Sequence, residues 1–155
     1  MNAYYELLKI LKNSLESNID INTVTQGDIN DVDLSKKTIF NLAHIQVNSA
    51  TFEENVILMN VSIFAMALRD INKEEVEYKF ESNDNEIDNH NTTLAVLRRT
   101  YNEIIHGTFN EADKLCVRGT PTLEIFHENR ENLLDGWVMT IDLEVDDNLM
   151  CVCCE

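Results

Sequence analysis

The chain has 155 residues, of which 28 are acidic and 12 are basic, so its formal net charge is −16. This length predicts one domain, residues 1–155, that buries a full core without help from disulfides or a metal. The acidic excess argues against a broad nucleic-acid-binding surface, because phosphate contacts need clustered Lys and Arg. Two interpretations of the charge stay open: a well-solvated surface, or an acidic wall that nucleic acid passes without sticking.

The N-terminal segment predicts a helix and no export signal. Its sequence, MNAYYELLKILKNSLESN, lacks a basic leading region, and Glu6, Lys9 and Lys12 interrupt its apolar residues. No apolar run in the chain is long enough to span a bilayer, so we expect a protein made in the cytosol, without a membrane partner. Apolar residues at three- and four-residue spacings predict a helix over residues 3–16 with an apolar stripe of Tyr4, Leu7, Leu8, Leu11 and Leu15. A short strand at residues 21–25 and a turn at residues 27–28 follow.

Residues 38–68 predict a long β-hairpin. Ala43, Ile45 and Val47 alternate with polar residues, which is typical of a strand with one buried face. His44 lies on the polar side, where a solvated or hydrogen-bonded structural histidine is expected. Residues 56–68 are apolar on both sides except at two positions, which is typical of a strand covered on both faces. The acidic loop at residues 52–55 joins the two strands.

The middle of the chain predicts an exposed loop and a second helix. Residues 72–91 are rich in Asn, Asp and Glu and carry little apolar periodicity, although Val76, Tyr78 and Phe80 alternate as in a short strand. A helix is expected over residues 92–106, capped by Asn91 or Thr92 and ended by a glycine at 107. Its predicted apolar face consists of Leu94, Leu97, Tyr101, Ile104 and Ile105.

Two strands are predicted in the last third of the chain. One covers residues 122–127, and the second has the sequence GWVMTIDLEV, with one apolar and one polar side. The predicted order is helix, hairpin, helix, hairpin, which favours an α+β fold with an antiparallel sheet built from two hairpins and flanked by two helices. The predicted core side of the last strand consists of Trp137, Met139, Ile141, Leu143 and Val145.

No motif in the sequence predicts an enzyme, a cofactor or a metal site. The four glycines are isolated, the four histidines are scattered, and neither GxSxG nor HExxH occurs. Three cysteines, Cys151, Cys153 and Cys154, cluster at the C-terminus. We expect free thiols there, because the spacing CxCC is too tight for a typical zinc site.

The stretch NTVTQGDINDVDLSKKTIFNLAHIQVNSATFEENVILMNVSIFAMALRD, a helix ending in IIHG, and LLDGWVMTIDLEV together resemble one known type of protein. They are similar to the tail-terminator and tail-completion proteins of tailed bacteriophages, of the kind found in phages of Bacteroidetes, including crAss-like phages. The resemblance implies a virion structural protein, made in the bacterial host cytoplasm, that forms a hexameric or dodecameric ring in the neck or tail. Portal, connector or tail proteins would be its neighbours, and double-stranded DNA would pass through the lumen without specific binding.

The hairpin carries more apolar residues than one face of a small sheet requires. Each such residue is most often found in a core, but as a set they suggest that helices or another subunit cover the second face. A small acidic adaptor or inhibitor that binds a host protein is the alternative function. For a ring, the predicted subunit interface consists of Phe52, Phe64 and Met66 at its centre, with Glu81, Asp84, Glu86 and Asp88 at the rim or facing the lumen.

Overall fold

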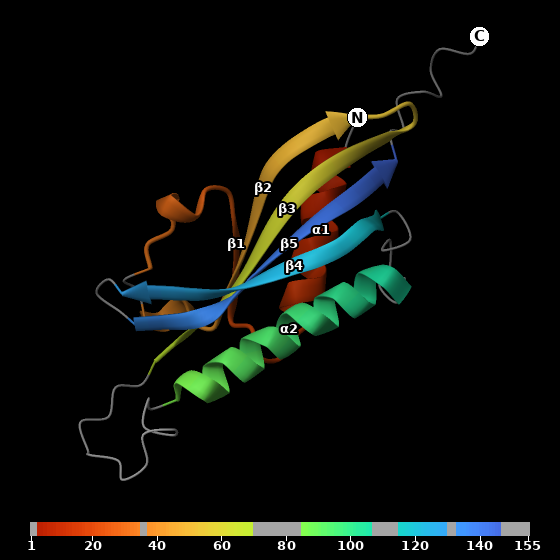
Figure 1. Cartoon of the computed structure of the whole chain (residues 1–155). Coiled ribbons are helices and arrows are strands. Elements are labelled where there is room, and N and C mark those ends of the chain that lie inside the picture. The colour runs from red at the N-terminus through yellow and green to blue at the C-terminus, as the bar shows by residue number, and fades with distance from the viewer. Residues whose placement is uncertain (1–2, 35–36, 70–84, 107–114, 130–132, 147–155) are drawn as a thin grey trace, which may run out of the picture.

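The protein is an α+β domain in which two helices pack against one face of a five-stranded mixed sheet (Figure 1). The computed structural model describes residues 3–34, 37–69, 85–106, 115–129 and 133–146. The elements in chain order are α1 (Ala3–Glu16), β1 (Thr23–Gln26), η1 (Ile29–Asp31), η2 (Lys37–Ile39), β2 (Leu42–Phe52), β3 (Val56–Leu68), α2 (Glu86–His106), β4 (Leu115–Asn129) and β5 (Leu133–Asp146).

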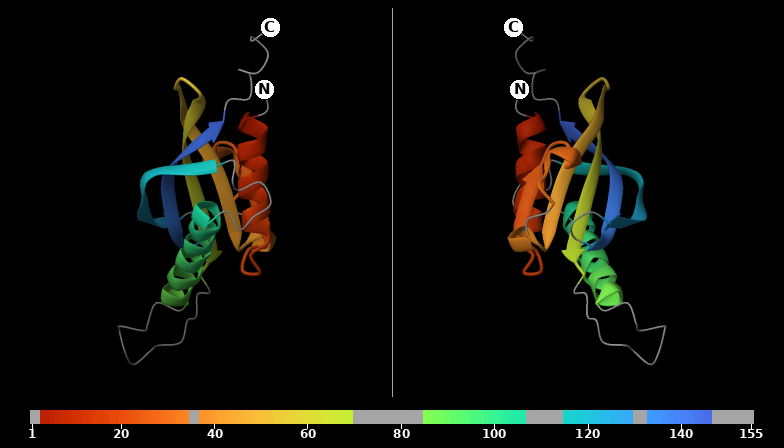
Figure 2. Two further views of the ribbon diagram at one scale, coloured as in Figure 1. Left: turned by 90° about the vertical axis from the view of Figure 1, so that its right-hand side faces the viewer. Right: turned by 90° about the vertical axis from the view of Figure 1, so that its left-hand side faces the viewer.

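The strand order is β1-β2-β3-β5-β4, and the sheet is strongly twisted (Figure 2). The pairs β2–β3, β3–β5 and β4–β5 are antiparallel. The prediction of a wholly antiparallel sheet is wrong, because β1 runs parallel to β2. The chain between these two strands is long enough to return to the end at which β1 starts, which is what a parallel pair requires.

The main core lies between the helices and the inner face of the sheet. Along β5, Met139, Ile141, Leu143 and Val145 are buried and Trp137 is partly buried, as predicted. Ala43 and Ile45 of β2 face the same core, also as predicted. β4 extends well beyond the predicted residues 122–127, and an irregularity between Arg118 and Thr122 shifts its register against β5.

The two helices bury a large part of their predicted faces, namely Leu7, Leu11 and Leu15 in α1 and Leu97 and Ile104 in α2. Tyr4 and Leu94, which belong to the predicted apolar faces, are exposed. In α2, hydroxyl side chains enter the buried face because the helix itself satisfies them: Thr93 Oγ1 donates to Asn89 O at 2.7 Å, and Thr100 Oγ1 donates to a carbonyl one turn earlier at 3.0 Å. The buried residues are Ala3, Leu7, Ile10, Leu11, Ser14 and Leu15 in α1, and Asn89, Thr93, Val96, Leu97, Thr100 and Ile104 in α2.

The helix α2 also starts earlier than predicted. It begins at Glu86, so residues 86–91, expected in an exposed loop, form its first turns. Asn91 and Thr92 therefore lie within the helix, and neither is its cap. The acidic residues Glu86 and Asp88, which favour a loop in the sequence, lie in the first turn of α2. Carboxylates are favourable there because they are near the positive end of the helix dipole. The predicted strand around Val76, Tyr78 and Phe80 lies outside the described residues, as does the cysteine-rich C-terminus.

A second, smaller apolar cluster covers one end of the outer sheet face. Residues 29–34 and 39–40 of the same chain, rather than the helices, lie over the end of β3. This explains why β3 reads as apolar on both sides towards its C-terminal end. The cluster consists of buried Leu34, Leu42, Met66 and Leu134, with Ile29, Val32, Ile39, Phe40, Phe64, Leu68 and Phe126 packed around them.

Candidate functional site

The structure separates the three apolar residues predicted at the subunit interface. Phe52, at the end of β2, is 80% exposed and remains available for a contact. Phe64 is partly buried in the second apolar cluster, and Met66 is fully buried there. Met66 therefore cannot form the centre of an interface, because residues 29–34 and 39–40 already cover it.

Of the four acidic residues predicted at the rim of the subunit interface, the structure describes two. Glu86 and Asp88 occupy the first turn of α2, where Asp88 is exposed and Glu86 pairs with Arg69 at 3.2 Å. Glu81 and Asp84 lie outside the described residues. The pairing of Glu86 corrects its assignment to a solvated loop, since its carboxylate belongs to a polar cluster at the base of residues 70–84.

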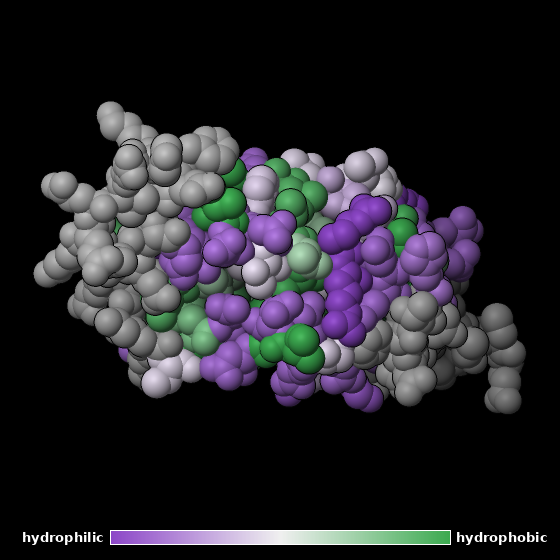
Figure 3. Space-filling model, turned by 90° about the horizontal axis from the view of Figure 1, so that it is seen from below, coloured by the Kyte–Doolittle hydropathy of each residue, from purple (hydrophilic) through white to green (hydrophobic). Residues whose placement is uncertain are grey.

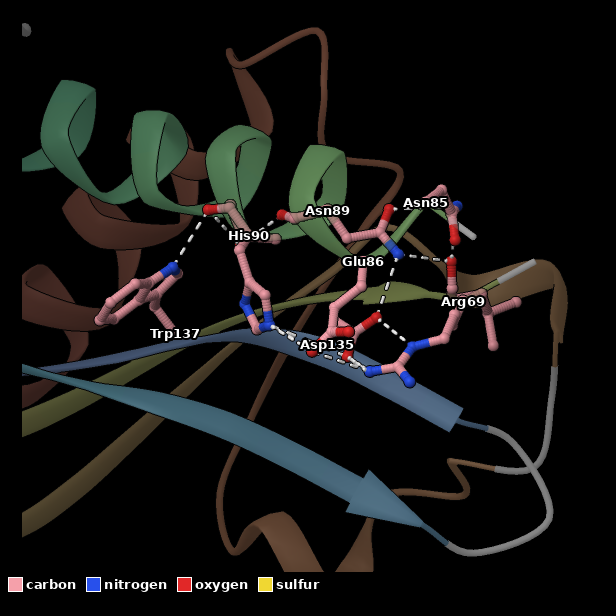
Figure 4. Close-up of polar contacts among 9 residues, drawn as sticks. Arg69, Asn85, Glu86, Asn89, His90, Asp135 and Trp137 are labelled. Carbon is pink, nitrogen blue, oxygen red and sulfur yellow. Dashed lines mark hydrogen bonds and ion pairs between the residues drawn. The ribbon is translucent and has the colours of Figure 1, made fainter. Parts of the chain in front are cut away.

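This polar cluster joins three elements of the fold (Figure 4). Arg69, just after β3, binds the buried Asp135 of β5 through two parallel contacts, Nε to Oδ2 at 2.9 Å and Nη2 to Oδ1 at 2.5 Å. Asn89 of α2 donates to the carbonyl of Leu68 at 2.9 Å and approaches Asp135 Oδ2 at 3.5 Å. The cluster thus holds the end of β3 and the start of α2 together on both sides of residues 70–84.

His90 connects the cluster to the sheet beneath α2. Its Nε2 lies 3.7 Å from Glu86 Oε1 and 3.9 Å from Asp135 Oδ1. Its backbone carbonyl accepts a hydrogen bond from Trp137 Nε1 at 3.0 Å, and the two rings meet edge to face (Figure 4). Burial alone raises the pKa of Asp135, but hydrogen bonds from Arg69 and Asn89 and the nearby positive charge hold that pKa below its ordinary value.

Three potential metal ligands meet in this cluster. One ligand atom each from Glu86, His90 and Asp135 lies within 4.8 Å of the others. However, Arg69 Nη2 contacts both carboxylates and so takes the position that a cation would occupy. The residues therefore fit a structural ion-pair network better than a metal centre, because a second cation beside the guanidinium would be repelled.

The sequence carried a signal for this cluster that the prediction missed. Glu86 and His90 are four residues apart, a spacing that places side chains on one helix face. The predicted loop over residues 86–91 conceals this helical spacing. The contribution of Asp135 depends on the register of β5 and has no local signature.

The uncovered part of the outer sheet face is polar, and hydrogen bonds cross it from strand to strand. Asn48 donates to Asn60 at 2.9 Å, and Asn60 donates to Asp142 at 2.7 Å. At its edge, Arg118 pairs with both Glu53 and Glu144. The hydrogen bond from Arg118 lowers the pKa of Glu53, which keeps that carboxylate charged. This face is therefore acidic, and the basic side chain at its edge, Arg118, is paired with carboxylates.

Two grooves lie at the opposite edges of the sheet. One, which we call the α2–β4 groove, has a volume of about 410 Å³ and a mainly apolar lining: Leu94, Leu97, Arg98, Tyr101, Thr120, Pro121, Leu123 and Met139. Figure 3 views the molecule from below, where apolar side chains emerge among hydrophilic ones. The other, which we call the α1–β1 groove, has a volume of about 740 Å³ and is lined by Tyr5, Leu8, Lys9, Lys12, Asn13, Val24, Thr25, Gln26 and Ile45.

The remaining polar residue of interest, His44, is fully buried. Its Nε2 lies 2.9 Å from the carbonyl of Gly27 and therefore donates, while Nδ1 lies 2.8 Å from Thr25 Oγ1. Of the two expected roles, the hydrogen-bonded structural one is confirmed and the solvated one is wrong. Burial lowers the pKa of His44 below 6.5, and this effect outweighs the hydrogen bond to Gly27 and the charge of Asp28.

This lowered pKa predicts a loss of stability in mild acid. Above pH 6.5, His44 is neutral in both the folded and unfolded states, so its full contribution is present. Below that pH, the unfolded chain binds a proton that the folded chain resists, so the free energy of unfolding falls by at most about 1.4 kcal/mol per pH unit. Urea unfolding at pH 7.5, 6.5 and 5.5 measures the slope. His44→Gln should reduce it, and an unchanged slope would assign the pH dependence to other groups.

The fold and these surfaces define an α+β domain with an acidic, hydrogen-bonded sheet face and unlike grooves at its two sheet edges. Neither a protein-family model nor a curated protein matches the sequence. Of the two described helices, neither combines the length and apolar character needed to cross a membrane.

Proposed function

We propose that the chain is a structural protein of a bacteriophage virion and forms a homo-oligomeric ring in the neck or tail, as a connector or tail terminator. The genome passes through the lumen of this ring, which contains six or twelve copies. Portal, connector or tail proteins contact its two ends. The sequence resemblance suggests this role, and one feature of the surface supports it most.

That feature is the acidic outer face of the sheet. Glu124, Asp142, Glu144 and Asp146 lie along β4 and β5 on this face, and Arg118 is paired with carboxylates. Hydrogen bonds between strands hold its polar side chains in place. Such a face suits a lumen wall, because carboxylates repel the phosphates of passing DNA and the fixed side chains offer few donors to bind them.

The two sheet edges supply a second argument. Rings are built from head-to-tail contacts, in which one patch of a subunit meets a different patch of the next. The α1–β1 groove and the α2–β4 groove are different patches at opposite edges of one sheet. Phe52, which is exposed beside Glu53 and Glu54, adds an apolar contact at the β2–β3 turn.

The alternative function is a small acidic adaptor or inhibitor that binds a host protein. The α2–β4 groove favours it, because Leu123 and Ile125 of β4 expose apolar surface beside this groove. A partner helix or peptide would bury that surface. An adaptor, however, would be monomeric or dimeric and absent from particles.

Localisation and stoichiometry test the proposal. We expect antibodies or peptide mass spectrometry to find the chain in purified virions, and cryo-electron microscopy to find it as a ring in the neck or tail. Native mass spectrometry of the purified chain over rising concentrations should give one closed species. A chain that is absent from virions and stays a monomer bound to a host protein would favour the adaptor.

Charge reversal tests the lumen assignment separately. Glu124→Lys/Asp146→Lys changes two exposed residues of the proposed lumen wall. We expect particles to assemble but to release DNA more slowly, because basic side chains bind phosphate, and the delay should shrink as salt rises. The control, Asp20→Lys, changes an exposed residue outside the sheet face and should leave release unchanged. Equal release by all three proteins would place the sheet face away from the DNA.

A further inference from the structure

We infer that the α2–β4 groove binds the β2–β3 turn of a neighbouring copy, with Phe52 inserted among its apolar side chains and Glu54 paired with Arg98. This inference rests on the proposed ring and names one contact between its subunits. The observations that carry it are the apolar lining of the groove, the arginine in that lining, and the exposed aromatic and acidic side chains of the turn.

The groove lies on the helix-facing side of the sheet, between α2 and β4. Because β4 is the last strand on this side of the sheet, α2 covers it only in part. Leu123 pairs with the buried Met139 of β5, yet it is 38% exposed, and Leu94 on the facing helix is 39% exposed. The volume of about 410 Å³ falls within the usual range of binding pockets, about 300–1,000 Å³.

The charge of the groove points to an acidic occupant. Of the four arginines that the structure describes, Arg69, Arg99 and Arg118 pair with carboxylates. Arg98, the basic residue among the described lining residues, contacts no carboxylate in the described part of the chain. Its guanidinium lies 5.7 Å from the centre of the Tyr101 ring, which leaves it able to pair with a carboxylate from outside.

The β2–β3 turn presents an apolar ring and a carboxylate. Phe52 pairs with Ile57 of β3, which is buried in the core, but Phe52 itself is among the most exposed large apolar residues described. Glu53 is already paired with Arg118. Glu54 is exposed and forms no ion pair with any residue that the structure describes.

The spacing of these groups matches that of the groove. Backbone positions two residues apart are at most about 7 Å from each other, so Phe52 and Glu54 act as one small patch. Leu94, Arg98 and Tyr101 follow one another at four and three residues, which places them on one face of α2. Insertion of Phe52 beside Leu94 and Tyr101 places its turn against this face. Glu54 then lies within reach of the Arg98 guanidinium.

The turn that fits the groove belongs to a second copy. Within one copy the β2–β3 turn lies at the end of the sheet away from α2, as two views of the molecule agree (Figures 1 and 2). The strands that carry the turn are paired along their length, so it cannot fold back onto the groove. Turn and groove are therefore two unlike patches, which is what a head-to-tail contact requires.

Phe52 is the anchor of a larger contact. A buried aromatic side chain contributes about 150–250 Å², whereas a stable interface buries about 1,600 Å² in total. The exposed side chains of Leu123 and Ile125 on β4 provide further apolar surface beside the groove. An aromatic anchor in a pocket with less critical contacts around it is the usual distribution of energy in an interface.

Photo-cross-linking from position 52 tests the contact in the full chain. Phe52 is replaced with benzoylphenylalanine, a photoreactive analogue, and this chain is mixed with an isotopically labelled wild-type chain. We expect irradiation to attach position 52 to labelled residues 94–101 or 120–123, since attachment to a labelled peptide proves that a second copy is the acceptor. The same analogue at Tyr5, an exposed residue of α1, is the control and should not attach to these residues. Attachment elsewhere, or only to another protein, or none to a second copy in concentrated protein and in virions, would overturn the inference.

A charge swap tests the pairing of Glu54 with Arg98. Arg98→Glu and Glu54→Arg each place like charges in the contact, and each should lower the cross-linking yield by about fivefold at physiological salt. The double variant Arg98→Glu/Glu54→Arg should recover the yield. Arg99→Glu, which changes the next residue of α2 outside the groove lining, is the matched control and should cross-link as the wild type does. Equal loss in Arg98→Glu and Arg99→Glu, or no recovery in the double variant, would show that this ion pair does not form.

The two proposals fail in different ways. If the wild type forms rings in virions but position 52 attaches to residues outside the groove, the contact is wrong and the ring stands. If position 52 attaches to the groove of a second copy but the chain is absent from virions, the proposed function is wrong and the contact stands.

Discussion

Replacing Ile141 with Asp is expected to unfold the domain or make it insoluble. Ile141 is 2% exposed on the helix-facing side of β5 and pairs with the fully buried Val61 of β3. An unpaired charge at this position would lower the free energy of unfolding by about 3–5 kcal/mol, a large part of the stability of a small domain. Chemical denaturation of soluble protein, or the soluble fraction on expression, measures the effect.

Two control variants separate burial from charge. Ile125→Asp introduces the same side chain at a position of β4 that is 53% exposed, and should change the free energy of unfolding by about 0.5 kcal/mol or less. Ile141→Val removes one methylene from the core and should cost about 0.5–1.5 kcal/mol. A soluble Ile141→Asp protein with wild-type stability would show that this side of β5 does not face the core.

Replacing Arg69 with Met is expected to have an effect of similar size. It removes both contacts to the buried carboxylate of Asp135 and leaves that charge unpaired, which costs about 3–5 kcal/mol. Arg99→Met is the matched control, because Arg99 pairs with Glu103 at the exposed end of its side chain and such pairs contribute about 0.3–0.5 kcal/mol. Urea unfolding at neutral pH measures both.

The pH dependence identifies Asp135 as the cause of that loss. In the wild type the pKa of Asp135 lies below its ordinary value of 3.8, so its contribution is present above that pH and is lost as the pH falls through the lower, folded-state pKa. In Arg69→Met burial raises the pKa of Asp135, so protonation relieves the buried charge in mild acid and the difference from the wild type should shrink. The double variant Arg69→Met/Asp135→Leu should recover much of the stability. A single variant within about 1 kcal/mol of the wild type would show that the ion pair is solvated.

The strands were the most predictable elements. Their side chains alternate with a period of two, so the core side of β5 and the start of β2 could be read directly from the apolar residues. The buried face of α2 could be read only in part, through Leu97 and Ile104. Its buried side contains Thr93 and Thr100, whose hydroxyls bond within the helix, and no apolar spacing reveals such residues.

The polar cluster was predictable only in part. The spacing of Glu86 and His90 is local and could have been read once the start of α2 was known. Arg69 and Asp135 are 66 positions apart in the chain, and they meet because β3 and β5 are neighbours in a particular register. Pattern reasoning treats each element separately, so it cannot give that register.

The sequence by itself determined that this protein is an acidic α+β domain, because length, charge and the periods of apolar residues are local properties. Only the tertiary structure decided which residues remain on the surface. Phe52 and Met66 look alike in the sequence, yet one is exposed and the other is covered by residues 29–34 and 39–40. The parallel pairing of β1, which creates the free edge of the α1–β1 groove, likewise depends on how the chain crosses between strands. Which side chains are covered and how the strands are ordered both depend on contacts between segments that are distant in the sequence. These contacts form only when the whole chain packs.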